Sequence, residues 1–556
     1  MKPTVPPAPG IPADAAPQRQ AAETMFRSAG ATSIAVFLSR ITGLVREILM
    51  ARFFGASMAY DAFTLGFRIP NLTRDLFAEG ALSSAFVPVF TQRLAQDTRE
   101  SAMRLVNLVA TTLALVVGVL CILGIVFASP MVDALADGFR STAGKHELAV
   151  RLTRIMFPFL LVVALAAQAM GVLNALGQFA VPALSSTLFN LGSVGGGLVL
   201  GVWLGGSMGI SRIEGMAWGV VFGGCLQLAW QMPSLYRAGY RFRPELDFTD
   251  PGVRRIMRLM GPAILGNAAV QINVMVNTNF ASSLHDPLRG ADGPVSWLSY
   301  AFRFMQLPLG LFGVAIAAAT LPTISRHAIA ADFDDLRRTL SRSVGMVFLL
   351  TIPSSVGLIL LGESMIGSIY QWGRFDAYDT RQAGIALSYF AIGLAGYSAL
   401  KVLTPAFYAL GDARTPMVVS LLSIAINFAV VSILVRQPGF GHAALAMSTS
   451  VVALFGFLVQ FLVLRHRIGG IYGRKLLTST LRILTASMVM GAVVAASSHL
   501  VMLWLGTTKS AYLTDLAVSI PLGAATFYGA CRILRIDELE LAMSSMAGPL
   551  RRRFGP

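Results

Sequence analysis

Long apolar runs separated by short polar segments dominate the chain from residue 31 to residue 536. Each run holds about 20 to 30 residues, which is the length that a helix needs to cross a bilayer. A membrane β-barrel would instead show segments of about ten residues with alternating polarity. We count about fourteen runs of bilayer length. They centre near Leu44, Asn71, Val116, Leu161, Leu191, Phe222, Val270, Gly310, Thr351, Ala395, Ala425, Phe455, Met490 and Leu522. The pattern predicts an all-α polytopic membrane protein.

Composition supports this fold class and explains the net charge. Of the 556 residues, 55% are hydrophobic and 13% are charged, whereas a soluble domain averages about 25% charged residues. The formal charge of +16 comes from basic residues between the spans and is typical of cytoplasmic loops, so we expect no nucleic-acid partner. Basic residues gather in alternate loops, which places both termini in the cytoplasm: Arg93, Arg99, Arg104, Arg237, Arg241, Arg243, Arg254, Arg255, Arg258, Arg326, Arg337, Arg338, Arg342, Arg465, Arg467, Arg474 and Lys475.

Two segments recur at one fixed offset. AFVPVFTQRL (Ala85–Leu94) returns as ATLPTISRHA (Ala319–Ala328), and NALGQFAVPALSS (Asn174–Ser186) returns as YALGDARTPMVVS (Tyr408–Ser420). In both pairs the shared prolines lie 234 residues apart. Six predicted spans separate the copies, so both copies enter the membrane in the same orientation. The repeat therefore predicts two parallel halves, as in transporters that bind substrate between halves near the midplane.

The repeat also sets the expected domain boundaries. Residues 1–30 are rich in Pro and Ala, lack the apolar core of a signal peptide, and are predicted to form a disordered cytoplasmic tail. Spans one to six make an N-lobe (31–236), and spans seven to twelve make a C-lobe (237–465). Spans thirteen and fourteen (466–536) are an appendage, and residues 537–556 form a basic cytoplasmic tail.

Arginines lie inside the predicted spans, where charges are expensive and rare. With a span that begins near Ala31, Arg40 lies about 14 Å deep and Arg46 about 22 Å deep. Arg74 in span two and Arg303 in span eight also fall near mid-depth. Guanidinium groups bind phosphate oxygens in a two-pronged arrangement, so these four residues predict a site for a phosphate-bearing anion.

Other polar residues in the spans leave alternatives open. Arg68 lies seven residues from both Asp61 and Asp75, so an internal ion pair is as good an interpretation as a ligand contact. Arg52 is expected to snorkel or cap at a helix end. The amides and hydroxyl of spans seven and eleven suit hydrogen bonds between helices better than a cation site: Asn267, Gln271, Asn273, Asn277, Ser423 and Asn427.

Several functional classes find no support. Cys121, Cys225 and Cys531 are far apart in apolar spans and have no metal-ligand spacing. No nucleotide-binding loop, hydrolase motif or zinc motif occurs in a loop large enough for a soluble active site. We therefore expect a transporter rather than an enzyme, with no cofactor and no metal.

A resemblance to a known family rests on four stretches. SRITGLVREILMARFFG, continuing through RIPNLTRDLFAEGALSSAFVPVF, resembles the MurJ (MviN) family of lipid II flippases within the MOP exporter superfamily. GPAILGNAAVQIN, VSW and LGDARTP add to the resemblance, which covers nearly the whole chain after the N-terminal tail. The resemblance implies fourteen helices. It also implies transfer of the undecaprenyl-pyrophosphate-linked peptidoglycan precursor, lipid II, from the inner to the outer leaflet of the bacterial cytoplasmic (inner) membrane.

The resemblance also implies roles for individual residues. The essential cavity arginines of the family correspond to Arg40, Arg46, Arg74 and Arg303. Its acid on the outer side of span two corresponds to Asp61, and we group the acids of spans one and two as gate or ion-pair residues: Asp61, Glu47 and Glu79. This chain departs from a relative at three positions. Asp75 stands where the relative has a second arginine, and Phe302 and Gln306 stand where it has acids that flank the arginine matching Arg303.

Partners and rival functions follow from the same comparison. In the family, spans thirteen and fourteen form a groove for the lipid tail. Besides lipid II and membrane lipids, cell-wall synthesis proteins are candidate partners, and we expect a monomer. Three rivals are an exporter of another anionic lipid-linked oligosaccharide, a non-transporting membrane scaffold for cell-wall synthesis, and a cation-coupled drug exporter. A drug exporter for cations would place acids in the cavity, and a scaffold needs no arginines there.

Overall fold

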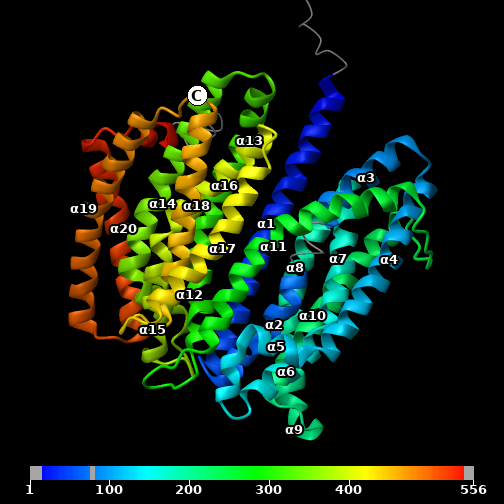
Figure 1. Ribbon diagram of the computed structural model, residues 1–556, viewed down its shortest axis with the longest axis horizontal. Helices are drawn as coiled ribbons and strands as arrows, with labels where there is room; N and C mark the ends of the chain where they lie inside the picture. Colours follow the sequence, from blue (N-terminus) through cyan, green and yellow to red (C-terminus); the bar gives the residue numbers. More distant parts are fainter. Residues whose placement is uncertain (1–14, 75–81, 544–556) are drawn as a thin grey trace, which may run out of the picture. The chain divides into compact units, whose positions relative to one another are not determined.

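The computed structural model describes residues 15–74 and 82–543 (Figure 1). For residues 15–33 and eight further positions it describes the backbone alone: Thr73, Ser83, Ser84, Pro262, Ala263, Leu265, Gly266 and Asn267. Within this part of the chain every named element is a helix, and one isolated β-bridge joins Asp286 to Gly290. The all-α fold class predicted from the hydrophobic pattern is confirmed.

The helices of the first half follow one another with short connections. They are α1 (Ala15–Phe54), α2 (Met58–Arg74), α3 (Ser83–Gln96), α4 (Arg99–Val126), α5 (Ala128–Ala136), α6 (Lys145–Met156), α7 (Pro158–Ala175), α8 (Ala180–Leu198), α9 (Gly205–Met208) and α10 (Arg212–Arg237). A 3-10 turn follows α5 (Asp137–Ser141), and a π-helical segment extends α8 (Val199–Trp203).

The second half continues in the same way. Its helices are α11 (Pro251–Ser282), α12 (Pro294–Pro308), α13 (Ala315–Ile329), α14 (Phe333–Tyr370), α15 (Ala377–Ile392), α16 (Leu394–Ala409), α17 (Arg414–Leu434), α18 (Ala443–Arg467), α19 (Gly473–Leu505) and α20 (Lys509–Ile533). A π-helical segment (Leu309–Val314) joins α12 to α13 in one continuous rod.

Nine helical stretches of the described chain are long and apolar enough to span a membrane, and α15 with α16 adds a tenth if this pair, bent by 44°, is one span. The count of fourteen is therefore not confirmed. The four other predicted runs correspond to α1, to α2, to α10 and to α11. Each contains charged or amide side chains: α1 and α2 carry the arginines, α10 carries Arg212 and Glu214, and α11 carries the amides. The described part of α2 is also only 17 residues long, shorter than a span needs.

The start of α1 lies within the segment predicted to be a disordered tail. The helix begins at Ala15 and runs without a break to Phe54. Residues 15–30 are rich in Ala, Gln, Arg, Glu and Met, which are strong helix formers, and this composition accounts for the early start.

The internal repeat is visible in the helix boundaries. The ends of α7 and α16, and the starts of α8 and α17, are each 234 residues apart. The turns between them match in conformation, because Gly177 and Gly411 have φ angles of +77° and +73°. Each glycine N–H donates to the carbonyl three residues earlier, on Asn174 and Tyr408 respectively. Two turns of the same geometry at one offset are the structural counterpart of the sequence repeat.

The chain divides into two compact units, which we describe separately. The first unit comprises Met1–Glu47, Ile69–Val126 and Leu152–Ile264. The second comprises Ile48–Arg68, Phe127–Arg151 and Leu265–Pro556. The second unit thus takes two segments from the half of the chain that we assigned to the N-lobe.

Glycines allow the closest helix packing in the first unit, between α8 and α10. A Cβ atom built on Gly219 would lie 2.3 Å from the carbonyl oxygen of Ser193, and one on Gly223 would lie 2.5 Å from that of Phe189. Only glycine lets the two backbones approach so closely, as is common between membrane helices. This contact holds α10 in the bundle although its sequence is less apolar than that of its neighbours.

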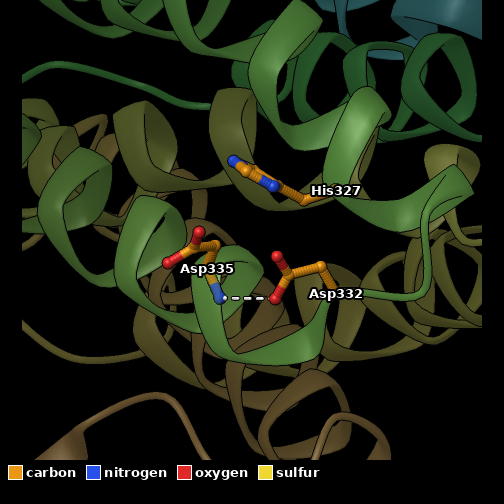
Figure 2. Close-up of side chains that lie close together, drawn as sticks. All are labelled: His327, Asp332 and Asp335. Atoms are coloured by element: carbon orange, nitrogen blue, oxygen red, sulfur yellow. Dashed lines mark hydrogen bonds between the residues drawn. The ribbon is translucent and has the colours of Figure 1, made fainter.

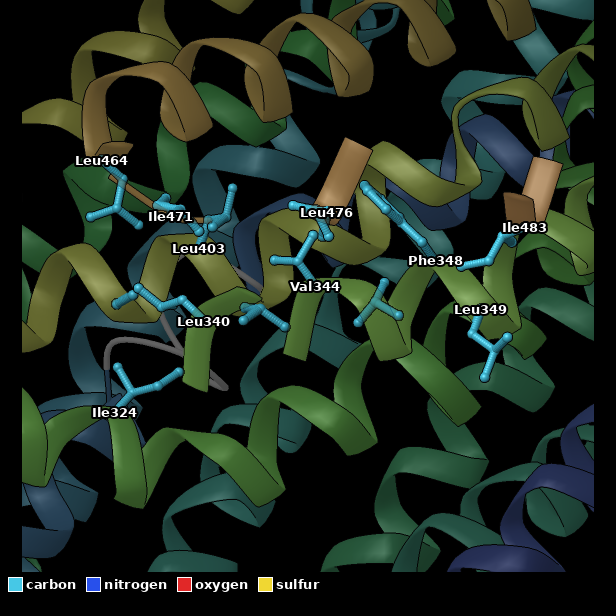
Figure 3. Close-up of a cluster of buried hydrophobic side chains, with 14 of the residues drawn as sticks. Ile324, Leu340, Val344, Phe348, Leu349, Leu403, Leu464, Ile471, Leu476 and Ile483 are labelled. Carbon is cyan, nitrogen blue, oxygen red and sulfur yellow. The ribbon is translucent and has the colours of Figure 1, made fainter. Parts of the chain in front are cut away.

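A large apolar core holds the second unit together. It comprises residues from α13, α14, α16, α18, α19 and α20, including Ile324, Leu340, Val344, Leu403, Leu464 and Ile483 (Figure 3). Leu340, Val344 and Leu403 have no exposed surface. The core packs α19 and α20 against the rest of this unit.

Candidate functional site

Two of the predicted ligand-binding arginines lie on α1 in the first unit. The Arg40 side chain is exposed. Arg46 has 14% of its side chain exposed and pairs with Glu47, with Nη2 3.1 Å from Oε1. Its guanidinium also lies over the ring of Phe189 on α8, 5.5 Å from the centroid. Arg46 is therefore partly desolvated, as a residue that binds an anion in a membrane would be.

The other two arginines belong to different units. Arg74 is the last residue of α2 and is counted with the first unit, whereas Arg303 lies on α12 in the second. Both are half-buried. Each is placed within its own unit, so the prediction that all four arginines line one cavity stays a prediction. Glu79 and Asp75 lie outside the described residues.

Arg68 and Arg52 have partners within the second unit. The Nη1 of Arg68 donates to the Oγ1 of Thr278 on α11 at 2.5 Å. Among the described residues no ion pair joins Arg68 to Asp61, whose carboxylate is bonded to other groups. Asp75, the other acid at a spacing of seven, lies outside the described residues, so the ion pair stays one of two interpretations. Arg52 stacks on the ring of Trp372 at 3.9 Å, which gives the end of α1 an aromatic anchor in place of a cap.

The side chain of Asp61, a residue of α2, lies at the N-terminus of α12. Its carboxylate accepts hydrogen bonds from the backbone N–H groups of Gly293 and Ser296, both at 3.0 Å, and from the Ser296 hydroxyl. These N–H groups have no partner inside the helix, and a carboxylate there is favoured by the helix dipole. Asp61 has no exposed surface. It thus fixes the start of the helix that carries Arg303.

Lys145 completes this site and is a residue that the sequence analysis missed. Its ammonium lies 2.9 Å from Oδ2 of Asp61 and 2.9 Å from Oδ1 of Asp292, and it donates to the Ala291 carbonyl at 2.7 Å. The side chain has no exposed surface and lies 4.6 Å from the centre of the Phe139 ring. A signal was present in the sequence, because lysine is rare in this chain: Lys145 is one of five lysines, and arginine supplies the other basic side chains. We call Asp61, Lys145, Asp292 and Ser296 the α12 latch.

A second set of polar contacts holds α12 from another direction. The Trp297 Nε1 donates to Oδ1 of Asp379 at 3.0 Å, and Asp379 also lies 3.6 Å from Arg289. The Tyr378 hydroxyl donates to Oδ2 of Asp286 at 2.8 Å. Two consecutive residues at the start of α12 therefore have different partners: Ser296 is bonded to Asp61, and Trp297 is bonded to Asp379 on α15.

The polar residues of α11 and α17 bond to one another across helices, as predicted. Asn273 donates to the Ser423 hydroxyl at 2.9 Å, and Asn427 donates to the Oδ1 of Asn277 at 3.0 Å. Ser448 on α18 donates to Asn427 at 2.5 Å. The amides are thus used as interhelical bonds. The side chain of Asn267 is not described.

Three potential metal ligands lie close together between α13 and α14: His327, Asp332 and Asp335 (Figure 2). Asp332 accepts a hydrogen bond from the N–H of Asp335 at 3.1 Å and so caps α14. Asp335 also pairs with Arg338 at 3.4 Å. Both carboxylates thus have local structural roles that account for their positions.

Comparisons with known proteins decide the family. The family described as "Lipid II flippase MurJ" matches residues 50–513. The chain belongs to the MurJ family. It is 37% identical over 455 residues to the lipid II flippase MurJ of Burkholderia cenocepacia, with 81% of this chain and 85% of that protein covered. It is 32% identical over 530 residues to the probable lipid II flippase MurJ of Vibrio cholerae, with 93% and 98% covered.

Solved structures agree with this assignment. A lipid II flippase MurJ in an inward closed conformation has a TM-score of 0.72 and 25% identity, over 90% of this chain and 99% of that one. An inward-facing MATE transporter of the MOP superfamily has a TM-score of 0.66 at 15% identity, over 78% of this chain and 94% of that one, and shows the shared fold. The resemblance read from the sequence motifs is confirmed, and the chain is a multi-pass membrane transporter of the MurJ family rather than an enzyme.

Proposed function

We propose that this chain flips lipid II from the inner to the outer leaflet of the cytoplasmic membrane by alternating access. The observation that carries the proposal is the MurJ family match over residues 50–513. The relatives from Burkholderia and Vibrio, which bear the name lipid II flippase, are covered over most of their length. The substrate class comes from the names of these proteins.

In this proposal the arginines of α1, α2 and α12 hold the pyrophosphate of lipid II. A pyrophosphate taken out of water loses its hydration, and guanidinium groups can replace it with charge-assisted hydrogen bonds. Arg46 supports the role, since it is already partly desolvated beside Phe189 on α8. Arg303 would supply the contact from the second unit, and Arg40 and Arg74 would complete the set.

The α12 latch is proposed to act as a gate on the outer side of the membrane. By the positive-inside rule both termini lie in the cytoplasm, so the start of α12 faces the outside. Asp61 and Lys145 hold this start with a buried ion pair and two backbone bonds. Alternating access needs contacts that exist in one state and break in the other, and each state is favoured only by its own contacts. The latch can meet this requirement, because its charged groups are paired while it is closed and could be hydrated by water once its members separate.

The helices α19 and α20 are proposed to hold the lipid tail. Both carry large apolar side chains that are well exposed, which a soluble surface would avoid but a lipid chain would cover: Leu477, Leu481, Leu484, Met488, Leu513, Val518, Ile520 and Leu522. The long isoprenoid tail would thus remain in an apolar environment while the head group crosses. We propose that the chain acts as a monomer and works beside cell-wall synthesis proteins.

Lipid II transfer by the purified protein in proteoliposomes tests the proposal. We expect the wild-type chain to flip lipid II and Arg303→Ala to lose nearly all transfer at equal reconstitution. Arg342→Ala, on a predicted cytoplasmic segment of α14, is the control and keeps the wild-type rate. A wild-type chain that leaves lipid II in place would overturn the proposal and favour the scaffold, whereas transfer of other lipid-linked oligosaccharides at equal rates would favour a broader exporter. Full activity of Arg303→Ala would refute the arginine site alone.

A further inference from the structure

A buried carboxylate lies between α14, α19 and α20, outside every site described above. Asp515 on α20 has no exposed surface. It accepts hydrogen bonds from the hydroxyls of Ser364 on α14 at 2.5 Å, Ser498 on α19 at 2.9 Å and Ser519 on α20 at 2.7 Å. Ser497 extends the cluster, with its oxygen 2.7 Å from that of Ser519. We call these five residues the serine–aspartate cluster. The three helices pack on one another (Figure 1).

The charge of this cluster is uncompensated. Among the described side chains, Asp515 has three hydroxyls as partners and no lysine, arginine or histidine. Burying an unpaired carboxylate in a membrane bundle is costly, and hydroxyl donors offset only part of that cost. Asp61, another buried aspartate of this unit, has Lys145 as its counter-ion. The serine–aspartate cluster lacks the corresponding cation.

The atoms around Asp515 are those that a hard cation prefers. Two carboxylate oxygens and the hydroxyl oxygens of Ser364, Ser497, Ser498 and Ser519 form an all-oxygen set. Oxygen ligands favour hard metal ions over soft ones. A hydroxyl has one proton and two lone pairs, so Ser364, Ser498 and Ser519 can each donate to Asp515 and still offer a lone pair to a cation.

The charge count selects a monovalent ion. One carboxylate with neutral hydroxyls carries a charge of −1, which one monovalent cation neutralises, whereas a divalent ion would leave a buried positive charge. The same three helices also carry a small apolar cluster of Leu361, Met490 and Val494. An ion here would add bonds to the hydrogen bonds that already join the three helices through Asp515.

We propose that the serine–aspartate cluster is a binding site for a hard monovalent cation, with Asp515 as its charged ligand. The site steadies α19 and α20 against α14. It does not rest on lipid II transfer, so each proposal can fail without the other.

The test uses the purified full-length chain in detergent, with Na⁺ as the probe. NaCl replaces choline chloride at constant ionic strength, so that screening does not change. A ligand that binds the folded state raises the unfolding midpoint with its concentration. We expect this rise in the wild type, together with saturable binding of one radioactive sodium ion per chain.

Variants locate the site. Asp515→Asn should weaken sodium binding on the order of 100-fold, and Ser498→Ala, which keeps the carboxylate, about tenfold. Asp537→Asn removes the same charge from an exposed pair with Lys475 and should leave binding unchanged. If Asp515→Asn does not fold, Ser498→Ala and the wild-type stoichiometry still decide. No saturable sodium effect in the wild type, or undiminished binding in both cluster variants, would overturn the proposal.

Discussion

The ion pairs of this protein differ most in how far their side chains are buried. Lys145 and Asp61 are fully buried, whereas Lys475 and Asp537 form a pair with 71% and 64% of their side chains exposed. Removal of one member of a buried pair leaves the other charge desolvated and costs about 3–5 kcal/mol. An exposed pair contributes about 0–1 kcal/mol.

We therefore expect Lys145→Met to lower the unfolding midpoint strongly and Lys475→Met to leave it nearly unchanged. The measurement is thermal unfolding of both purified variants in the same detergent. Asp61→Asn combined with Lys145→Met should recover part of the loss, because no charge is then left unpaired. Equal stability of the two single variants would show that the α12 latch does not stabilise the fold.

Asp250 gives the clearest pH dependence outside the spans. Burial opposes its ionisation, but hydrogen bonds from Arg93 at 2.9 Å and from backbone N–H groups outweigh burial and hold the pKa of Asp250 below its ordinary value. A depressed folded-state pKa stabilises the fold above the unfolded-state pKa of about 3.9, and this contribution is lost as the pH falls through the folded-state pKa.

Asp250→Asn should accordingly be less stable than the wild type at pH 7, and the difference should shrink as the pH falls below about 4. Unfolding midpoints between pH 7 and pH 3.5 check this. Arg93→Gln removes the main partner and should flatten the same pH dependence. A stability difference that stays constant with pH would contradict the account.

At the scale of elements, the sequence repeat predicted the positions of two matching turns but did not predict which distant side chains pair. The α7–α8 and α16–α17 turns fall at the predicted offset because glycine and proline act locally. The partners of Asp61 and Asp515 could not be predicted in this way. Lys145 lies 84 residues from Asp61, and Ser364 lies 151 residues from Asp515. Such pairs depend on how helices pack, which no local pattern records.

The two repeat turns should respond alike to substitution. Gly177 and Gly411 have positive φ angles and open space where a Cβ would lie, so alanine there costs only backbone strain, about 1–2 kcal/mol. Gly118 also has open space but lies within α4, and alanine there should be neutral or stabilising by up to about 1 kcal/mol. We expect the unfolding midpoints of Gly177→Ala and Gly411→Ala to fall by similar amounts while that of Gly118→Ala does not. A similar effect at all three positions would contradict the turn geometry.

At the scale of the whole molecule, hydrophobic patterning was enough for the fold class, and motifs were enough for the family. The span count was less predictable, because α1 and α11 carry charged or amide side chains that membrane helices usually lack, and because the described part of α2 is only 17 residues long. Arg40, Arg46 and Arg74 of the candidate site lie on α1 and α2, whereas Arg303 lies on α12, which is apolar enough to span a membrane. Function thus weakens the signal that identifies a membrane helix, and the polar helices must be recognised by the family motif instead.

Orientation in the membrane is a property of the whole chain that the charge of its connecting segments predicts. The segment between α18 and α19 is basic, with Arg465, Arg467, Arg474 and Lys475, whereas the α19–α20 segment carries Lys509 alone. The positive-inside rule places the first segment in the cytoplasm and the second outside.

Single cysteines test this arrangement in intact cells. Cys225 is exposed and is replaced by serine first, while Cys121 and Cys531 are buried. We expect a membrane-impermeant maleimide to label Thr507→Cys directly and Arg474→Cys only after the cells are permeabilised. Both residues are exposed in the structure, so a difference in labelling reports the side of the membrane rather than burial. The reverse pattern would invert the chain, place the α12 latch on the cytoplasmic side, and remove its proposed role as an outer gate.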